Sequence, residues 1–453
     1  MRKKFESNIP FPVQSWPGYY GWVVLVFGTL GMIAAVPGSP PGISVFVDVM
    51  ITSLNLDRDS FSLAYMLGTM TAGLAAPYAG RMIDHFGARM VACFSFFGLG
   101  AVLIYTGSIH HIHSIGLPFL SPELGAFLLL FSAFAGIRFI GVSFAMTACR
   151  SMVFKWFEGR RGIAAAINGV VLSLSFSSAP VLLNKFVLNF SWQQTWIGLG
   201  IIFIVGVLPM AWIFYRDSPE ACGVEVEQGS AKSDWKTRIP VLKEYTGPQA
   251  IRSYTFWVFT SALALNALIG TGVSFHMIEI ADQAGLARST AVEIFLPVAL
   301  FHIATTLILG FLAERIRMKY AVVLMIAAQL LALYGISNVG ESEWRWLFIV
   351  GSGVGWGSFG ILINVPWPRF FGRRHLGAIN GWVTGATVVT SAMGPYLFGL
   401  CAEIFDSFIP VFALCVHLRF QILSNFSSTS NPNHPRAIFR DAEWFSAPCA
   451  PQT

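Results

Sequence analysis

Long apolar runs recur along this chain, and they constrain its fold more than any other feature. Bilayer hydrocarbon is about 30 Å thick, so a helix rising 1.5 Å per residue needs about 20 apolar residues to cross it. Since a bilayer offers no water to unpaired backbone groups, each such run is expected to form a helix. The sequence therefore predicts an all-α integral membrane protein. Eleven runs reach that length, over the ranges Gly21–Met50, Ser60–Ala79, Ala88–Gly107, Pro122–Met152, Gly162–Leu183, Trp192–Tyr215, Ser253–Met277, Thr290–Ala313, Tyr320–Ile336, Trp346–Val365 and Leu376–Ala402.

Composition supports the same fold class. The chain is 55% hydrophobic and only 11% charged, whereas soluble domains carry about 25% charged residues. The sequence contains no H-E-x-x-H or G-x-S-x-G motif and no C-x-x-C pair, and its outer-loop histidines, His110, His111 and His113, are expected to be solvated. Neither an enzyme nor a metal or cofactor site is expected.

Basic residues in the loops predict the orientation of the chain. With a cytoplasmic N-terminus, the outer loops hold only Arg58, Lys185, Arg288 and Arg345, while most other lysines and arginines fall on the inner side. We therefore expect a multi-pass protein of the plasma (inner) membrane with its N-terminus in the cytoplasm.

Two loop sequences occur twice, which indicates an internal repeat. The segment GRMIDHFGARM, Gly80–Met90, returns as GFLAERIRMKY, Gly310–Tyr320. Likewise FEGRRGIAAAING, Phe157–Gly169, returns as FFGRRHLGAING, Phe370–Gly381. Each segment follows the same helix of its half. The predicted organisation is a six-helix bundle over 1–215, a cytoplasmic linker over 216–252, a second bundle over 253–423, and a polar, disordered tail over 424–453.

The segment GRMIDHFGARM resembles the G-x-x-x-D-x-x-G-R-[KR] signature of the major facilitator superfamily, and the resemblance covers about residues 18–416. YYGWVVLVFGTLG at the first span, KWFEGRRG at Lys155–Gly162 and DSPEACG at Asp217–Gly223 resemble its monocarboxylate and oxalate:formate branch. The resemblance implies two six-helix bundles related by pseudo-symmetry, which surround a central cavity and rock to give alternating access.

The resemblance also implies a conformational latch in the first loop motif, formed by Gly80, Asp84, Gly87 and Arg89. Gly80 permits close helix approach. Asp84 is expected to cap the start of the third span and to pair with Arg81 and Arg89. The alternative is a plain basic loop that sets topology.

The second copy of this motif contributes Gly310 and Glu314 to the latch. Arg317 replaces the glycine that would match Gly87, so a weaker latch is expected there.

Arg138 is the one deep charge that the sequence places in the first half, and no acidic residue lies deep beside it. Intramembrane charges usually have a function or a partner, and a guanidinium binds carboxylates in a fork geometry. We therefore expect Arg138 to contact an anionic substrate. The alternative is a structural arginine bonded to backbone carbonyls.

The second half offers Asn266, His302 and Thr306 as substrate contacts facing Arg138. His302 and Thr306 share a helix face, and imidazole can change charge near neutral pH, which suits proton coupling. The alternative for His302 is a neutral side chain bonded between helices. The branch resemblance fails here, because Pro41, His302 and Thr306 stand where monocarboxylate carriers have a lysine and an Asp/Arg pair, and the eleventh span lacks the lysine of oxalate:formate exchangers.

The function expected from these features is secondary active transport of a small solute, with an organic anion such as a monocarboxylate as one candidate. The expected partners are the small-molecule substrate, with co-transport of a proton or exchange for a counter-anion both left open, and the lipid bilayer. A monomer is expected, with no nucleic-acid partner. The alternatives are a facilitator of a sugar or drug, a non-transporting receptor, or an inactive truncated carrier.

The twelfth span is expected to be short or defective. Its apolar run, Phe408–Val416, has room for only about 14 Å of helix, and continuing it admits His417 and Arg419, which are costly at depth unless Arg419 snorkels to the interface. We expect no packed structure from about Ser424 onward. The abrupt change suggests an altered reading frame after about Val416; the alternative is a genuinely short helix.

Overall fold

The computed structural model describes residues 9–115, 121–226, 244–287, 290, 293–313 and 315–429, and these residues form helices and no strands. In the first half the helices are α1 (Gly21–Ile33), α2 (Pro40–Ile43), α3 (Val47–Leu54), α4 (Arg58–Phe86), α5 (Ala88–Ile115), α6 (Pro122–Gly136), η2 (Ile137–Met146), α7 (Thr147–Trp156), α8 (Arg161–Phe190), α9 (Trp192–Ile202), η3 (Phe203–Val207) and α10 (Leu208–Phe214). In the second half they are α11 (Gly247–Ile251), α12 (Tyr254–Gln283), α14 (Phe295–Leu312), α15 (Met318–Ser337), α16 (Ser342–Leu362), α17 (Pro366–Phe371), α18 (Leu376–Phe405) and α19 (Ile409–Thr429).

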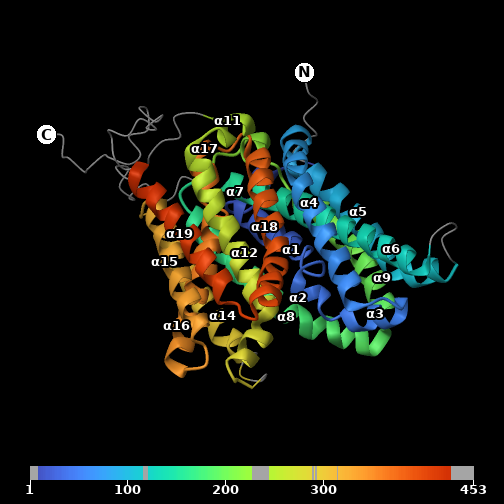
Figure 1. Ribbon diagram of the computed structural model, residues 1–453. Helices are drawn as coiled ribbons and strands as arrows, with labels where there is room; N and C mark the ends of the chain where they lie inside the picture. Colours follow the sequence, from blue (N-terminus) through green and yellow to red (C-terminus); the bar gives the residue numbers. More distant parts are fainter. Residues whose placement is uncertain are drawn as a thin grey trace.

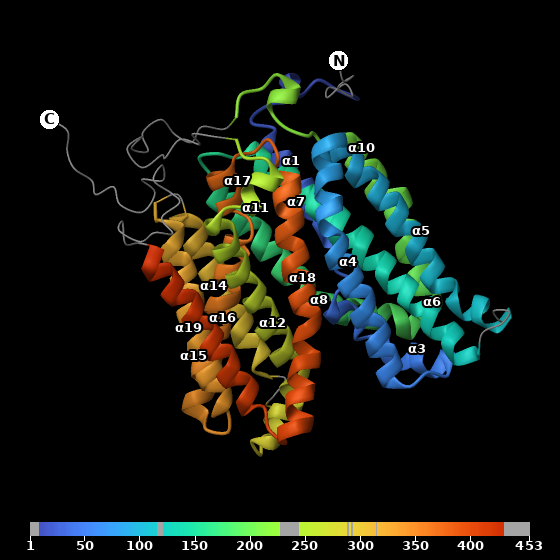
Figure 2. The ribbon, with the colours of Figure 1, turned by 45° about the horizontal axis from the view of Figure 1, so that its top comes forward.

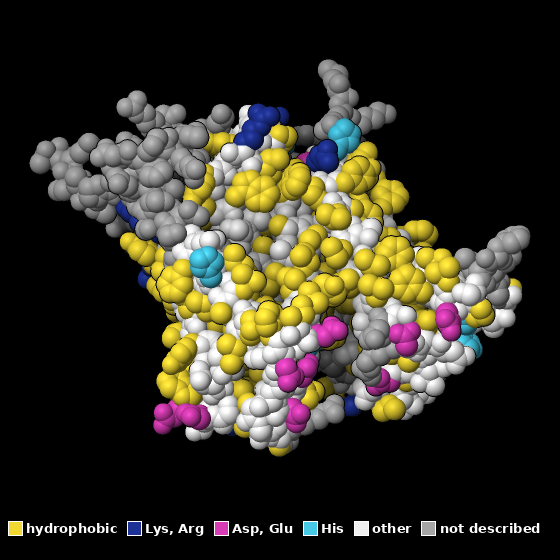
Figure 3. All heavy atoms as spheres, viewed as in Figure 1, with side chains coloured by type: hydrophobic (Ala, Val, Ile, Leu, Met, Phe, Trp, Pro, Cys, Tyr) yellow, Lys and Arg dark blue, Asp and Glu magenta, His cyan; other side chains and the backbone are white. Residues whose placement is uncertain are grey.

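The described helices suit a membrane. Nine of them are long and apolar enough to cross a bilayer, and two shorter apolar helices are Gly21–Ile33 and Ile409–Gln421. Large apolar side chains such as Leu74, Leu188 and Leu296 are more than two-thirds exposed. Figure 3 shows apolar side chains over the middle of one face, with acidic groups near its lower end and basic groups near its upper end. Such a surface fits lipid better than water.

The two halves meet chiefly through two helix pairs, α4 with α18 and α8 with α14. We call the end that carries the four repeated loop segments the motif side. In Figures 1 and 2 the first half (blue to green) and the second half (yellow to red) lie close together at this end, and Figure 2 shows them diverging toward the other.

The contacts within these two helix pairs are likewise found toward the motif side. On α4 they run from Gly73 to the motif-side end, and on α8 from Gly162 to Ser173. Farther along α8, Val181 and Phe186 are exposed. The described contacts therefore hold the halves together on the motif side.

The first span is broken into short helices. Between α1 and α2 the chain runs through a turn at Ala34–Ser39, all of it buried. Pro40 and Pro41 lack the N–H groups that a continuous helix would need, and Gly42 can accept the close approach of the Val36 and Pro37 carbonyls. The break places backbone carbonyls in the middle of the bundle.

The last span differs from its expected length. Helix α19 continues past Val416 to Thr429, so its backbone stays helical across Ser424, where the sequence predicts the tail to begin. Arg419 does not snorkel: it is fully buried and turns into the second bundle. Inward hydrogen bonds replace the aqueous contact that snorkelling would have given. Residues 430–453 lie outside the described part of the chain.

Candidate functional site

Arg138 lies in a π-helical segment, η2, between α6 and α7. Such segments are rare and often mark functional sites, because the wider turn re-aims side chains. The guanidinium is buried (7% exposed). Its Nη1 donates a 3.4 Å hydrogen bond to the Gly38 carbonyl in the broken first span, and its central carbon lies 5.9 Å from the centre of the Tyr65 ring.

These contacts leave the charge of Arg138 only partly compensated. The bond to Gly38 is long, the same carbonyl accepts a 3.2 Å bond from the Tyr65 hydroxyl, and Nε of Arg138 has no partner. Within the described residues no carboxylate pairs with this arginine. A buried cation with an unused N–H is suited to binding an anion.

Arg150 is a second buried cation that the sequence analysis missed. The sequence counts it among the basic residues of the inner side, yet it lies within α7 and is 6% exposed. Its Nη1 is 3.4 Å from the Thr384 hydroxyl on α18. One residue on, Ser151 accepts a 3.1 Å bond from the Asn380 amide. The predicted span Pro122–Met152 includes Arg150, so the length of that span could have indicated that Arg150 lies within a membrane helix.

His302 and Thr306 lie where α14 crosses α8. His302 Nδ1 is 3.4 Å from the Ser173 hydroxyl of the first half. Thr306 is fully buried, and its hydroxyl donates a 3.4 Å bond to the Gly357 carbonyl on α16. A methyl group at Gly169 would crowd the Thr306 side chain. His302 therefore bridges the two halves, and Thr306 fills the crossing.

Asn266 is placed differently from His302. It is fully buried in the second bundle, and its neighbours there are Gly355 and Gln329 on α16 and α15. Neither its amide oxygen nor its amide nitrogen has a partner. The described contacts bring His302 to the interface between halves but do not bring Asn266 together with Arg138.

Asp84 does not act as the sequence predicts. Its two carboxylate oxygens accept hydrogen bonds from the backbone N–H groups of Gly377 (2.9 Å) and Ala378 (2.7 Å). It therefore caps α18 of the opposite half, not the start of the third span. The prediction failed because a cap was sought along the sequence, whereas the closest free helix N-terminus belongs to the other bundle.

Asp217 takes the role that was assigned to Asp84. One of its oxygens accepts a 2.7 Å bond from the backbone N–H of Arg89, at the start of α5. Gly87, at φ +92°, turns the chain here, and any side chain at that position would collide with the Asp217 carboxylate.

The Arg89 side chain turns away from Asp84. It donates to the Ile9 carbonyl (2.7 Å) and to the Trp212 carbonyl, and it stacks over the Trp212 ring. The expected Asp84–Arg89 pair is thus replaced by contacts that fix the N-terminal segment to the first half.

The first glycine of each motif copy, Gly80 or Gly310, lies at a crossing between the halves. A Cβ at Gly80 would collide with the Gly377 carbonyl, and a Cβ at Gly310 with the Ala166 side chain and the Gly162 carbonyl. Close backbone approach at both crossings needs the missing side chain. Glu314, the remaining latch residue, lies outside the described residues.

The sequence of this chain also matches the model of a known protein family. The model described as Major Facilitator Superfamily covers residues 25–395. The chain belongs to the major facilitator superfamily. It is accordingly a multi-pass membrane protein, and its family points to a transporter rather than an enzyme.

Known proteins of this superfamily resemble the chain over most of its length. YcxA of Bacillus subtilis (strain 168), an uncharacterised MFS-type transporter, is 21% identical over 413 residues, which are 87% of this chain and 91% of that protein. The human organic anion transporter MFSD10 (TETRAN) is 16% identical, with a TM-score of 0.58, over 90% of this chain and 100% of that one.

Two further solved structures share the fold. A bacterial homologue of the iron transporter ferroportin, in an outward-facing state, has a TM-score of 0.63 and 12% identity, covering 89% of this chain and 99% of that one. The Escherichia coli fucose:proton symporter FucP has a TM-score of 0.61 and 12% identity, covering 90% and 98%. At these identities the matches establish the fold.

Proposed function

We propose that this superfamily transporter carries small organic anions by alternating access, with Arg138 as the residue that binds the anionic group. The observation that carries the proposal is the guanidinium of Arg138. It is buried, unpaired at Nε and held by a single long bond to a broken helix. Discontinuous helices commonly form the substrate sites of secondary transporters.

The charge of Arg138 explains why an anion is favoured over a neutral solute. Holding an uncompensated cation away from water costs several kcal/mol. A substrate carboxylate would offset that cost and would accept hydrogen bonds from two guanidinium nitrogens. Monocarboxylates are the simplest members of this substrate class.

The basic loops support a cytoplasmic motif side, and with it a cytoplasmic N-terminus. In that orientation the described contacts close the cytoplasmic side, which corresponds to an outward-facing state. Arg150 and Thr384 then lie between the Arg138 region and the closed side. Transport requires these contacts, and the Asp84 cap, to separate once per cycle.

Uptake by purified protein in liposomes tests this proposal. Radiolabelled small carboxylates should enter, and Arg138→Met should lower uptake at least tenfold, because the guanidinium is the binding charge. Arg345→Met is the matched control and should keep normal uptake, since Arg345 donates to the loop carbonyls of Val339 and Gly340. Carboxylate uptake that survives Arg138→Met at normal expression would refute the assignment, and selective uptake of sugars or drugs instead would refute the substrate class.

A further inference from the structure

Another buried cation, Arg419, lies in the second bundle, far along the sequence from the proposed substrate contact. Its Nη1 donates a 3.2 Å bond to the Ala262 carbonyl on α12, and its Nη2 donates to the Gln329 side-chain oxygen on α15. Its Nε has no partner, and within the described residues it forms no ion pair. The charge is therefore enclosed by three helices without a counter-charge.

Asn266 lies one helical turn beyond Ala262, so the two share a face of α12. Both polar atoms of its amide are buried and unpartnered, and an unmade buried hydrogen bond costs about 1–3 kcal/mol. A Cβ built on Gly355 would be 3.7 Å from Asn266 Oδ1, 3.2 Å from Gln329 Cγ and 4.0 Å from Gln329 Nε2. Asn266 and Gln329 thus border one small space beside Gly355.

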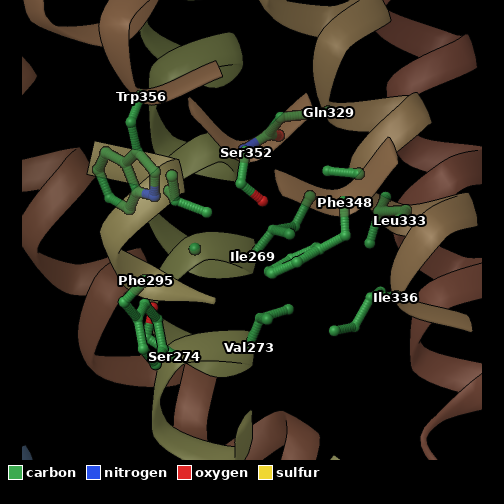
Figure 4. Close-up of a pocket in the computed structure, with 13 residues that line it drawn as sticks. Ile269, Val273, Ser274, Phe295, Gln329, Leu333, Ile336, Phe348, Ser352 and Trp356 are labelled. Atoms are coloured by element: carbon green, nitrogen blue, oxygen red, sulfur yellow. The ribbon is translucent and has the colours of Figure 1, made fainter. Parts of the chain in front are cut away.

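Gln329 also lines a cavity of about 70 Å³ between α12, α14, α15 and α16. Figure 4 shows Gln329, Ser352 and Trp356 toward one end of that cavity, while apolar side chains such as Val273 and Ile336 lie toward the other. The cavity admits a small ion or a water but is too small for an organic substrate.

We propose that Arg419, Asn266 and Gln329 form a binding site for a small monovalent inorganic anion of the size of chloride. The Nε–H of Arg419 and the amide N–H groups of Asn266 and Gln329 supply the hydrogen bonds, and the guanidinium supplies the charge. The anion compensates the cation and satisfies the unpaired donors together. This site stands apart from Arg138, so it does not depend on the proposed transport substrate.

Thermal unfolding of the full-length protein in detergent tests the site. Sodium chloride, compared with sodium sulfate at equal ionic strength, should raise the Tm saturably by about 2–4 °C. Asn266→Leu removes a hydrogen-bond donor and keeps the side-chain volume. It should raise the chloride concentration that gives half of the Tm increase at least tenfold. Arg138→Met is the matched control for loss of a buried cation and should keep the full chloride response.

Two outcomes of the thermal-unfolding experiment would overturn the proposal. One is a wild-type Tm that is the same in chloride and sulfate; the other is an undiminished chloride response in Asn266→Leu. The Arg419→Met variant is not used as a test of the site, because it also removes the hydrogen bonds from Arg419 to α12 and α15 and can fail to fold for that reason. Crystals grown in bromide give a direct measurement: an anomalous peak within hydrogen-bond distance of Arg419 Nε is expected, and its absence at saturating bromide would exclude the site.

Discussion

Asp84 caps α18 of the opposite half, and this contact predicts how Asp84→Asn changes the equilibrium between the two transport conformations. The substitution replaces one carboxylate oxygen by an NH₂ group. In Asp84→Asn, one acceptor oxygen remains, but an amide NH₂ group replaces the oxygen that accepts from the second backbone N–H. The variant loses one hydrogen bond, worth about 0.5–1.5 kcal/mol, and a charge at a helix N-terminus, worth about 0.3–1 kcal/mol and up to about 2 kcal/mol when buried.

Together these losses destabilise the state closed on the motif side by about 1–3 kcal/mol, which is a shift of about 5- to 150-fold in the equilibrium between states. Since Asp84 and α18 belong to different halves, the penalty falls on closure and not on folding of either half. We therefore expect slower uptake at normal expression and an unchanged Tm.

Pulsed electron spin resonance measures this equilibrium. Spin labels at Phe86 and Tyr320, exposed positions near the motif-side ends of the two halves, should show a larger population of long distances in Asp84→Asn than in wild type. Asp217→Asn is the matched control, because Asp217 caps α5 within its own half and its loss should leave the distances unchanged. Equal distance distributions and equal uptake for wild type and Asp84→Asn would refute the reasoning.

Two more variants test the helix crossings between halves. Gly80→Ala should also favour the state open on the motif side and slow uptake, because even a methyl group collides with the Gly377 carbonyl; Gly198→Ala, which has open space, should behave as wild type in the same spin-label assay. His302→Gln should abolish any stimulation of uptake by an imposed proton gradient while keeping a hydrogen bond to Ser173; stimulation that persists in liposomes would exclude His302 as the coupling residue.

The sequence predicted the helical membrane fold because hydrophobic length is a local property. It also located the paired loop motifs, and it identified Arg138 as a deep cation. It failed for the partners of charged loop residues. Asp84 and Arg89 are five residues apart, yet one bonds the opposite half and the other bonds Ile9 and Trp212. The hydrogen-bond partners of these side chains depend on which helix ends meet in the folded protein, and the local sequence does not determine that.

Depth within the bilayer was the other property that local sequence described poorly. Arg419 breaks the apolar pattern of the last span, and the pattern alone favours an exposed position for it. The structure instead buries it on Gln329 and the Ala262 carbonyl, neither of which is near it in sequence. Side-chain amides on α15 and open carbonyls on α12 make that inward position possible, and only packing brings them together.

The placement of the Asp84 carboxylate has a consequence for biogenesis. The first turn of a helix has free N–H groups that need acceptors, and for α18 the described side-chain acceptor is supplied by α4, synthesised almost three hundred residues earlier. A second half produced alone would leave the start of α18 without this cap. We expect that fragment to fray where Leu376 begins the helix, and co-expression of the first half to restore it, so that the two bundles assist each other's assembly.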